Sequence, residues 1–499
     1  MQTQCKPERS RRLIYGEWNM KARNTWRNLV VLFALFIATV VALPAQTLTV
    51  LKSFNGTDGH GSAGPLVQGL DGNLYGTSAG GGTNNDGTIF RVSTGGALKT
   101  LYTFCPQAGC LDGTNPEGGL VLGTDGNFYG TTHQGGLGGG TVFKITPKGV
   151  FTLLYQFCSL SNCADGELPN GQLVQGLDGR FYGTTEGGGA DGNGTVFSIS
   201  LAGDFTTTHS FCGYFGCGDG AYPYSGLALG NDGNFYATNH SSGANGWGTF
   251  FRITPGGTVT TLYNFCVFTN CTDGGYPGSG LLQGSDGEFY GTTMEGGTAF
   301  SQCATGCGTI FKVTTGGTLT TLHRFDVKDG YLTLDLASLV QGTDGNFYGT
   351  TENGGLGKKG TIYQITSGGT FTTLENLFGS TGDVPAAGLV QATDGNFYGT
   401  TTAGGGISNS GTIFKLSMGL GSFVQTLPTA GKVGSAVKIL GTNLTGSTAV
   451  TFNGKGATFK VVSATEITTK VPAGATTGTV EVDTPSGMLS SKVPFRVTH

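Results

Sequence analysis

Short alternations of apolar and polar residues, separated by glycine-rich turns, recur along residues 47–417. In residues 118–157 the order is GGLVLG, a TDG turn, NFYGTT, a glycine-rich loop, GTVFKIT, a PKG turn and VFTLLYQF. Alternation with a period of two between turn residues predicts β-strands. Because no stretch beyond the N-terminal region has the helical spacing of apolar residues, the pattern predicts an all-β protein with four short strands in each unit.

The unit occurs seven times. Its hairpin aspartate recurs every 50 to 58 residues, at Asp71, Asp125, Asp178, Asp232, Asp286, Asp344 and Asp394. Asp-Gly between apolar residues predicts a type I′ hairpin, with calcium binding by these aspartates as the rival interpretation. The Phe and Tyr of NFYGTT point to opposite faces of one strand, so both faces of each sheet must be covered. A period near that of kelch blades therefore predicts a seven-bladed β-propeller with four-stranded blades.

The two ends of the repeat region complement each other. Residues 47–59 match the fourth strand of a unit and the loop after it, whereas the seventh unit stops after its third strand, at residues 411–417. The N-terminal strand is therefore expected to complete the last blade and close the ring without an open edge.

The regions that flank the repeats differ from them in composition and pattern. Basic residues precede an uncharged apolar run at residues 29–43, which predicts a signal peptide over residues 1–45, or an uncleaved N-terminal anchor, with Met20 as a candidate true start. Residues 46–418 are expected to form the propeller. Residues 419–499 alternate in short strands without cysteine, and we expect an immunoglobulin-like β-sandwich there.

Ten cysteines of the exported part fall into close pairs. They are Cys105 with Cys110, Cys158 with Cys163, Cys212 with Cys217, Cys266 with Cys271, and Cys303 with Cys307. Local disulfides are the preferred interpretation, and they agree with a secreted, periplasmic or cell-surface bacterial protein. Zinc is the alternative, but the pairs occur once per repeat, so two pairs are not expected to meet around one ion.

Charge is divided unevenly along the chain. Residues 46–421 hold 13 basic and 26 acidic side chains, and residues 422–499 hold seven and three. Nucleic-acid binding by so acidic a propeller is not expected. The basic sandwich is expected to dock on the propeller or to meet an acidic glycan. A membrane would be involved only through an uncleaved N-terminal segment.

Two family resemblances follow from these motifs. The repeats resemble the GloVer tandem repeats of exported bacterial proteins, through DGNFYGTT, the following GG, and strands such as GTIF and GTVF. The C-terminal segment resembles the IPT/TIG domain, and the residues that carry this likeness are Pro428, Gly431, Gly434, Val437, Ile439, Gly441, Asn443, VTFNG at 450–454, Ile467 and VPAG at 471–474. The first resemblance implies a surface or secreted protein and no particular activity.

No catalytic pattern is present. The sequence has no H-E-x-x-H, G-x-S-x-G or Walker motif, so we assign no catalytic residue, no cofactor and no metal ligand. Four residues after the Tyr of each unit the side chain varies, and equivalent positions of a propeller share one face. The polar members, His133, Glu186, His240 and Glu352, are the candidate ligand-binding residues, with solvated loop residues as the alternative.

The preferred function is an exported or cell-surface binding or adhesion protein. The propeller would be the ligand-binding platform, with an extracellular glycan or a cell-surface protein as the partner, and the sandwich would be a spacer or a second binding module. Two alternatives stay open. One is an extracellular polysaccharide hydrolase or lyase on a propeller scaffold, and the other is a structural surface protein. The oligomeric state does not follow from the sequence.

Overall fold

The computed structural model describes residues 46–62, 64–212, 218–331, 338–406 and 408–498. Within these residues the chain forms 39 strands and two 3-10 helices of three residues each, η1 (Ser161–Cys163) and η2 (Thr269–Cys271). The all-β prediction is confirmed. The predicted signal peptide or anchor, residues 1–45, lies outside the described residues.

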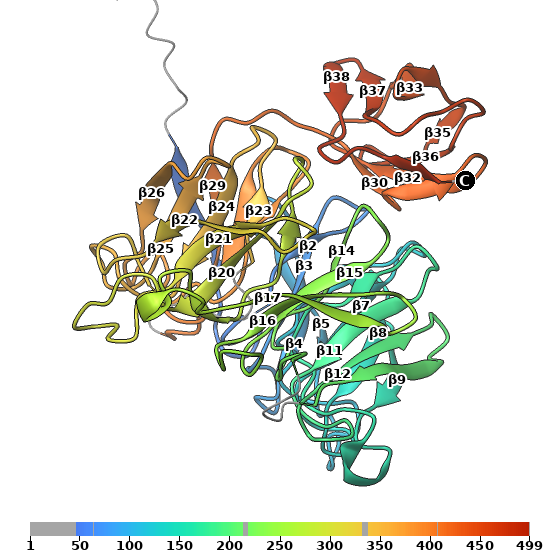
Figure 1. Ribbon diagram of the computed structural model, residues 1–499. Helices are drawn as coiled ribbons and strands as arrows, with labels where there is room; N and C mark the ends of the chain where they lie inside the picture. The colour runs from blue at the N-terminus through green and yellow to red at the C-terminus, as the bar shows by residue number, and fades with distance from the viewer. Residues whose placement is uncertain (1–45, 63, 213–217, 332–337, 407, 499) are drawn as a thin grey trace, which may run out of the picture. The chain divides into compact units, whose positions relative to one another are not determined.

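Residues 64–376 carry six antiparallel sheets whose strands lie side by side in chain order (Figure 1). The first three sheets are β2 (Val67–Gln68), β3 (Leu74–Ser78), β4 (Thr88–Val92), β5 (Leu98–Thr103); β6 (Val121–Leu122), β7 (Phe128–Thr132), β8 (Thr141–Ile145), β9 (Phe151–Gln156); and β10 (Val174–Gln175), β11 (Phe181–Thr185), β12 (Thr195–Ile199), β13 (Phe205–Ser210). The next three are β14 (Ala228–Leu229), β15 (Phe235–Asn239), β16 (Thr249–Ile253), β17 (Val259–Asn264); β18 (Gly275–Pro277) and β19 (Leu282–Gln283), which both pair with β20 (Phe289–Glu295), then β21 (Thr309–Val313), β22 (Leu319–Arg324); and β23 (Val340–Gln341), β24 (Phe347–Thr351), β25 (Thr361–Ile365), β26 (Phe371–Asn376).

The seventh sheet joins the two ends of the repeat region. Its strands are β27 (Val390–Gln391), β28 (Phe397–Thr400), β29 (Thr412–Ser417) and, from the start of the described chain, β1 (Thr47–Ser53). β1 lies antiparallel to β29, with Thr47 opposite Ser417 and Ser53 opposite Thr412. In Figure 1 the blue strand lies against this orange sheet. The predicted closure by the N-terminal strand is confirmed.

Successive sheets pack face to face through aromatic side chains. Tyr75 of the first sheet stacks on Phe128 of the second with ring centroids 4.0 Å apart, and the next five junctions have the same pair at 3.8 to 4.3 Å. At the last junction Tyr398 shares a buried cluster with Leu74 of the first sheet. Because each sheet is covered on both faces and the last meets the first, the repeats form a closed, propeller-like fold.

The hairpin between the first two strands of each sheet differs from the predicted type I′ turn. In the first sheet, Gly72 N–H donates to Gly69 C=O (2.9 Å) and Gly69 N–H to Asn73 C=O (2.8 Å), and Gly72 has a φ of 78°. Asp71 is not among the residues with positive φ, although a type I′ turn would require it. The connection is therefore a three-residue loop that ends in a left-handed glycine, and the type I′ prediction was wrong.

Residues 423–498 form a separate β-sandwich. One sheet has the order β30 (Gln425–Leu427), β32 (Ala436–Leu440), β36 (Glu466–Lys470), β35 (Phe459–Val461), and the other has the order β34 (Lys455–Gly456), β33 (Ala449–Phe452), β37 (Val480–Thr484), β38 (Gly487–Ser490). A short parallel pair joins β31 (Ala430–Lys432) to β39 (Arg496–Thr498). The core between the sheets includes Val437, Phe452 and Val482. This is the expected immunoglobulin-like domain.

Candidate ligand-binding site

The longer connections of each sheet lie at the end opposite the Asp-Gly hairpins. In a sheet of four antiparallel strands, the link from the second to the third strand and the exit to the next sheet must share one end. Isolated bridges join these two kinds of connection, as between Thr114 and Gln134. We call this end, formed by the links between second and third strands and between successive sheets, the loop face.

A left-handed residue in the inter-sheet connections ties neighbouring sheets together on the loop face. Asn115, with a φ of 54°, donates its N–H to Asp86 C=O of the preceding sheet (3.0 Å) and accepts from His133 N–H of its own sheet (2.9 Å). The same conformation recurs at Leu168, Tyr222, Tyr276 and Val384. Left-handed backbone costs a residue with a side chain about 1–2 kcal/mol. Strain of this kind is a reason to look for function nearby.

Three of the four sequence-predicted residues are hydrogen-bonded directly to these left-handed residues. The N–H groups of His133, Glu186 and His240 donate to the left-handed residues of their own sheets, at 2.9 to 3.0 Å. All four predicted side chains, including Glu352, are half-buried. These positions are therefore structurally equivalent on the loop face, while a ligand for them stays a prediction.

Glu117 brings two of the predicted residues together. It precedes β6 by four residues and was missed by the sequence reasoning. Burial raises the pKa of its carboxyl, the His133 imidazole lowers that pKa, and the carboxylate of Glu186 in the next sheet raises it. Glu117, His133 and Glu186 therefore form one electrostatic group across the second and third sheets. Aligning the repeats four residues before the first strand would have revealed the variable Glu117, Asn170 and Tyr224.

His240 has an aromatic environment instead of a charged one. Its ring lies 4.7 Å from Tyr224 and 5.0 Å from Tyr276, and Tyr276 lies 4.7 Å from Trp247. Burial lowers the pKa of His240 to about 4, so the imidazole is neutral near neutral pH. Its Nδ1 atom, like that of His133, is buried without a hydrogen-bond partner among the described residues.

Glu352 in the sixth sheet stands apart from both groups. Burial raises the pKa of its carboxyl, and no charged neighbour among the described residues contributes to that shift. The residues of the equivalent inter-sheet connection, 332–337, lie outside the described part of the chain. Glu352 therefore shares the register of the other three predicted residues but not their neighbours.

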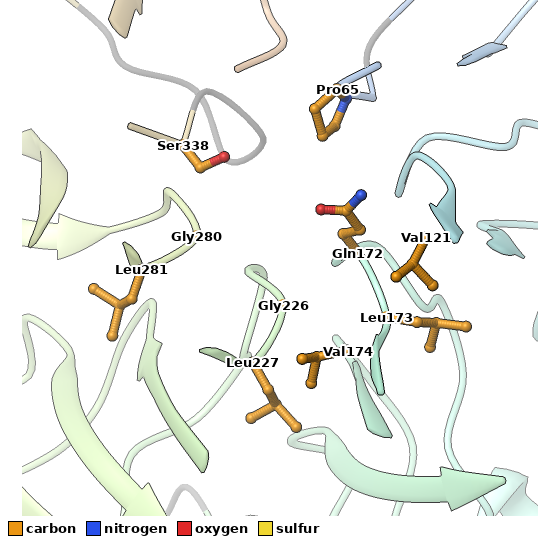
Figure 2. A pocket seen from close by; sticks show the side chains of 10 residues that line it. All are labelled: Pro65, Val121, Gln172, Leu173, Val174, Gly226, Leu227, Gly280, Leu281 and Ser338. Atoms are coloured by element: carbon orange, nitrogen blue, oxygen red, sulfur yellow. The ribbon is translucent and has the colours of Figure 1, made fainter. Parts of the chain in front are cut away.

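A cavity of about 250 Å³ lies between the first strands of the sheets (Figure 2). Six sheets contribute to its wall, which consists of Pro65, Val121, Gln172, Leu173, Val174, Gly226, Leu227, Gly280, Leu281 and Ser338. Glycine is required here, because a Cβ on Gly226 would lie 2.3 Å from Gln172 C=O. The wall carries no charge, so the titratable groups of the candidate site are outside it.

Four of the predicted disulfides are present: Cys105–Cys110, Cys158–Cys163, Cys266–Cys271 and Cys303–Cys307. For the fifth pair, Cys217 lies outside the described residues. Among those residues, the two clusters with metal-ligand spacing are Asp86 with Cys105 and Cys110, and Glu167 with Cys158 and Cys163. Since both cysteines of each cluster are disulfide-bonded, they offer no thiolate to a metal. Disulfides are typical of proteins that mature outside the cytoplasm.

The geometry defines a class of protein: a closed ring of small β-sheets with one elaborated loop face, followed by an immunoglobulin-like module. The Gloeobacter/Verrucomicrobia repeat matches residues 37–232 and 223–454, and the chain belongs to this family. An IPT/TIG domain matches residues 422–497. Both resemblances drawn from the sequence are confirmed, and the combination fits a surface-binding protein.

Solved structures with a similar fold are distant. The extracellular domain of a putative hybrid two-component system from Bacteroides thetaiotaomicron has 10% identity and a TM-score of 0.48, over 80% of this chain and 46% of that one. A fungal alcohol oxidase of the AA5 family, solved with copper, has 13% identity and a TM-score of 0.49, over 91% of this chain and 100% of that one. With TM-scores below 0.5, neither carries an argument about function.

A search among curated proteins found no match. In the described residues, no helix is long and apolar enough to cross a membrane.

Proposed function

We propose that the protein acts outside the cytoplasm as a surface-binding protein that takes a glycan on the loop face of its propeller. One observation carries this proposal. Glu117, His133 and Glu186, which are far apart in the sequence, share one electrostatic group on the face where the side chains vary between repeats. Carboxylates accept hydrogen bonds from sugar hydroxyls, and imidazole offers both a donor and an acceptor. The IPT/TIG domain would serve as a spacer or a second binding module.

A glycan array tests this proposal directly. The probe is the compact unit that starts at Gln46. Glu186→Gln is expected to weaken the binding of the selected glycan about tenfold or more, since hydrogen bonds to a charged group are strong. Asp191→Asn is the matched control, because Asp191 is an exposed acid in the same sheet's loop. A folded chain that binds no glycan, or equal losses in both variants, would contradict the proposal.

Glycoside hydrolysis is the second candidate, and a specific observation favours it. A carboxyl whose pKa is raised by burial and by a neighbouring carboxylate, as for Glu117 beside Glu186, suits a general acid. Hydrolysis would require the two carboxyl groups to lie about 5–9.5 Å apart across the glycosidic bond. The parent chain would be a hydrolase if it releases new reducing ends from the glycans that it binds on the array. The Glu117→Gln variant should then lose this release and still bind the glycans. If the parent chain binds glycans but releases no reducing ends, hydrolysis is refuted and the binding function stands.

A further inference from the structure

Glu117, His133 and Glu186, which we call the acidic group, belong to the second and third sheets. In the fourth and fifth sheets, the loop face carries a compact aromatic group. It consists of Tyr224, His240, Trp247 and Tyr276, and we call these four residues the aromatic group. His240 and Tyr276 are stacked, with planes 27° apart, and Trp247 follows Tyr276 with planes 46° apart. All four side chains are half-buried, so each keeps part of its surface exposed to solvent.

The fold does not require aromatic residues at these positions. Tyr276, at a φ of 50°, occupies the left-handed position that Asn115 fills in the second sheet. Asn tolerates this conformation better than Tyr does. Tyr224 takes the place of Glu117 and Asn170 four residues before the first strand, and His240 that of Glu186 after the second. The strained backbone at Tyr276 therefore presents an aromatic ring where the repeat itself needs none.

We infer that the aromatic group is a stacking subsite for an uncharged sugar ring, so that the glycan of the proposed function is an oligosaccharide spanning this subsite and the neighbouring acidic group. This inference rests on the proposed function and specifies its ligand. One face of a pyranose ring exposes mainly C–H groups, which pack on rigid aromatic surfaces, while its hydroxyls point outward to polar partners. Aromatic lining with a few polar groups is the usual composition of a ligand site.

Charge decides which sugars fit. In the third sheet, Glu186 holds the position that His240 holds in the fourth, and the acidic group adds Glu117, so carboxylates lie on the third-sheet side of the aromatic group. None of the four aromatic-group residues carries a positive charge near neutral pH, because His240 is neutral there. Uronic acids and sulfated sugars would be repelled by the neighbouring carboxylates. The subsite therefore selects neutral hexose or pentose rings.

The sequence supplies a probe for this subsite. The chain has three tryptophans, Trp18, Trp26 and Trp247, and only the last lies beyond residue 45. In a chain that starts at Gln46, all tryptophan fluorescence thus reports on the aromatic group. Titration with neutral hexasaccharides of glucose, xylose and N-acetylglucosamine is expected to change the Trp247 emission for at least one of them. Oligogalacturonate of the same length is expected to leave the emission unchanged.

Substitutions complete the test. Tyr276→Asn installs the residue that the second sheet already holds at this left-handed position, so folding should be retained. Loss of the stacking surface is expected to weaken binding of the neutral hexasaccharide about tenfold. Phe268→Ala is the control, because Phe268 is 60% exposed in a disulfide loop of the same face and lies outside the aromatic group. Its affinity should match that of the parent chain.

The outcomes separate the subsite from the proposed function. If glycans bind but the Trp247 emission and the Tyr276→Asn affinity do not change, the aromatic subsite is refuted while the binding function stands. If oligogalacturonate binds as well as the neutral sugars, the charge argument is refuted. If the folded chain binds no glycan at all, the proposed function and the subsite are refuted together.

Discussion

At the scale of single residues, the repeated aspartate of each unit serves the hairpin and the core together. Asp125 Oδ1 accepts the N–H of Asn127 (3.0 Å), and Oδ2 accepts the hydroxyl of Tyr129 (2.8 Å). All seven repeats have this aspartate–tyrosine bond. Burial raises the pKa of the tyrosine, and the bond to aspartate raises it further. The motif therefore has a structural explanation that needs no calcium ion.

Tyr129→Phe isolates the bond from the packing. The variant keeps the ring that packs 4.1 Å from Phe181 but removes the hydroxyl. Since Asp125 retains its bonds from Asn127, the loss should cost about 1 kcal/mol of propeller stability. Differential scanning calorimetry is expected to show a small fall in Tm, and Tyr129→Ala, which also removes the ring, a much larger one. Equal values for Tyr129→Phe and the parent chain would show that the bond contributes nothing net.

Another repeated aspartate, in the connections between sheets, explains His323. Tyr155 stacks on Phe205 at 3.8 Å and donates to Asp165 at 2.8 Å. His323 repeats this arrangement, stacking on Phe371 at 4.0 Å with its Nε2 2.7 Å from Asp329.

His323→Tyr should therefore be tolerated, whereas His323→Leu should destabilise the junction between the fifth and sixth sheets. Leucine fills part of the space but leaves Asp329 without this partner, at a cost of about 1–3 kcal/mol. Thermal unfolding monitored by circular dichroism distinguishes the two. A Tyr variant less stable than the Leu variant would mean that the repeats are not interchangeable at this position.

At the scale of elements, the disulfide loops are small structures that repeat with the sheets. η1 and η2 each contain a left-handed asparagine, Asn162 with a φ of 57° and Asn270 with a φ of 60°. Asp165 holds the first of these loops by accepting the N–H groups of Ser159 (3.0 Å) and Leu160 (3.3 Å). Hydrogen bonds and crosslink therefore restrain the same few residues.

Removing one crosslink should have a local effect. In the chain-entropy description, closing so short a loop contributes about 2 kcal/mol, and part of that order persists through Asp165. Cys158→Ser/Cys163→Ser is expected to increase hydrogen exchange in residues 158–165 far more than in β11 or β12. Mass spectrometry of exchanged peptides measures this. Uniformly faster exchange over the third sheet would instead show that the disulfide stabilises the whole repeat.

The elements were predictable from the sequence because they depend on local patterns. Turn glycines and alternating strands gave the sheets, and cysteine spacing gave the four observed disulfides. The turn type was missed, because Asp-Gly suits both a type I′ turn and the observed loop with a terminal glycine. Glu117 and the contact of His240 with Tyr276 were missed because they arise between sheets, where a single repeat contains no signal.

At the scale of the whole molecule, a strand pair and a side-chain hydrogen bond close the ring where the seventh sheet meets the first. β1 pairs with β29, and Gln68 of the first sheet accepts the N–H of Thr393 in the seventh (2.9 Å). Glutamines at equivalent positions make the same bond across four other junctions, from Gln175, Gln283, Gln341 and Gln391. The closing junction thus has the amide bond of an ordinary junction and, in addition, a strand from the other end of the chain.

A chain that starts at Phe54 tests how much the closing strand matters. Without β1, the outer edge of β29 loses its partner and Leu51 no longer covers the buried cluster around Tyr398. An unpaired edge also invites association between molecules. We expect a markedly lower Tm than for the chain that starts at Gln46, together with concentration-dependent aggregation and stronger binding of a hydrophobic dye. Because Gln68 and the other junctions stay intact, the remaining sheets should keep their circular-dichroism spectrum at low temperature. If the truncated chain unfolds at the same temperature as the longer one, the packing between sheets closes the ring without β1, and the first strand is only an edge cover.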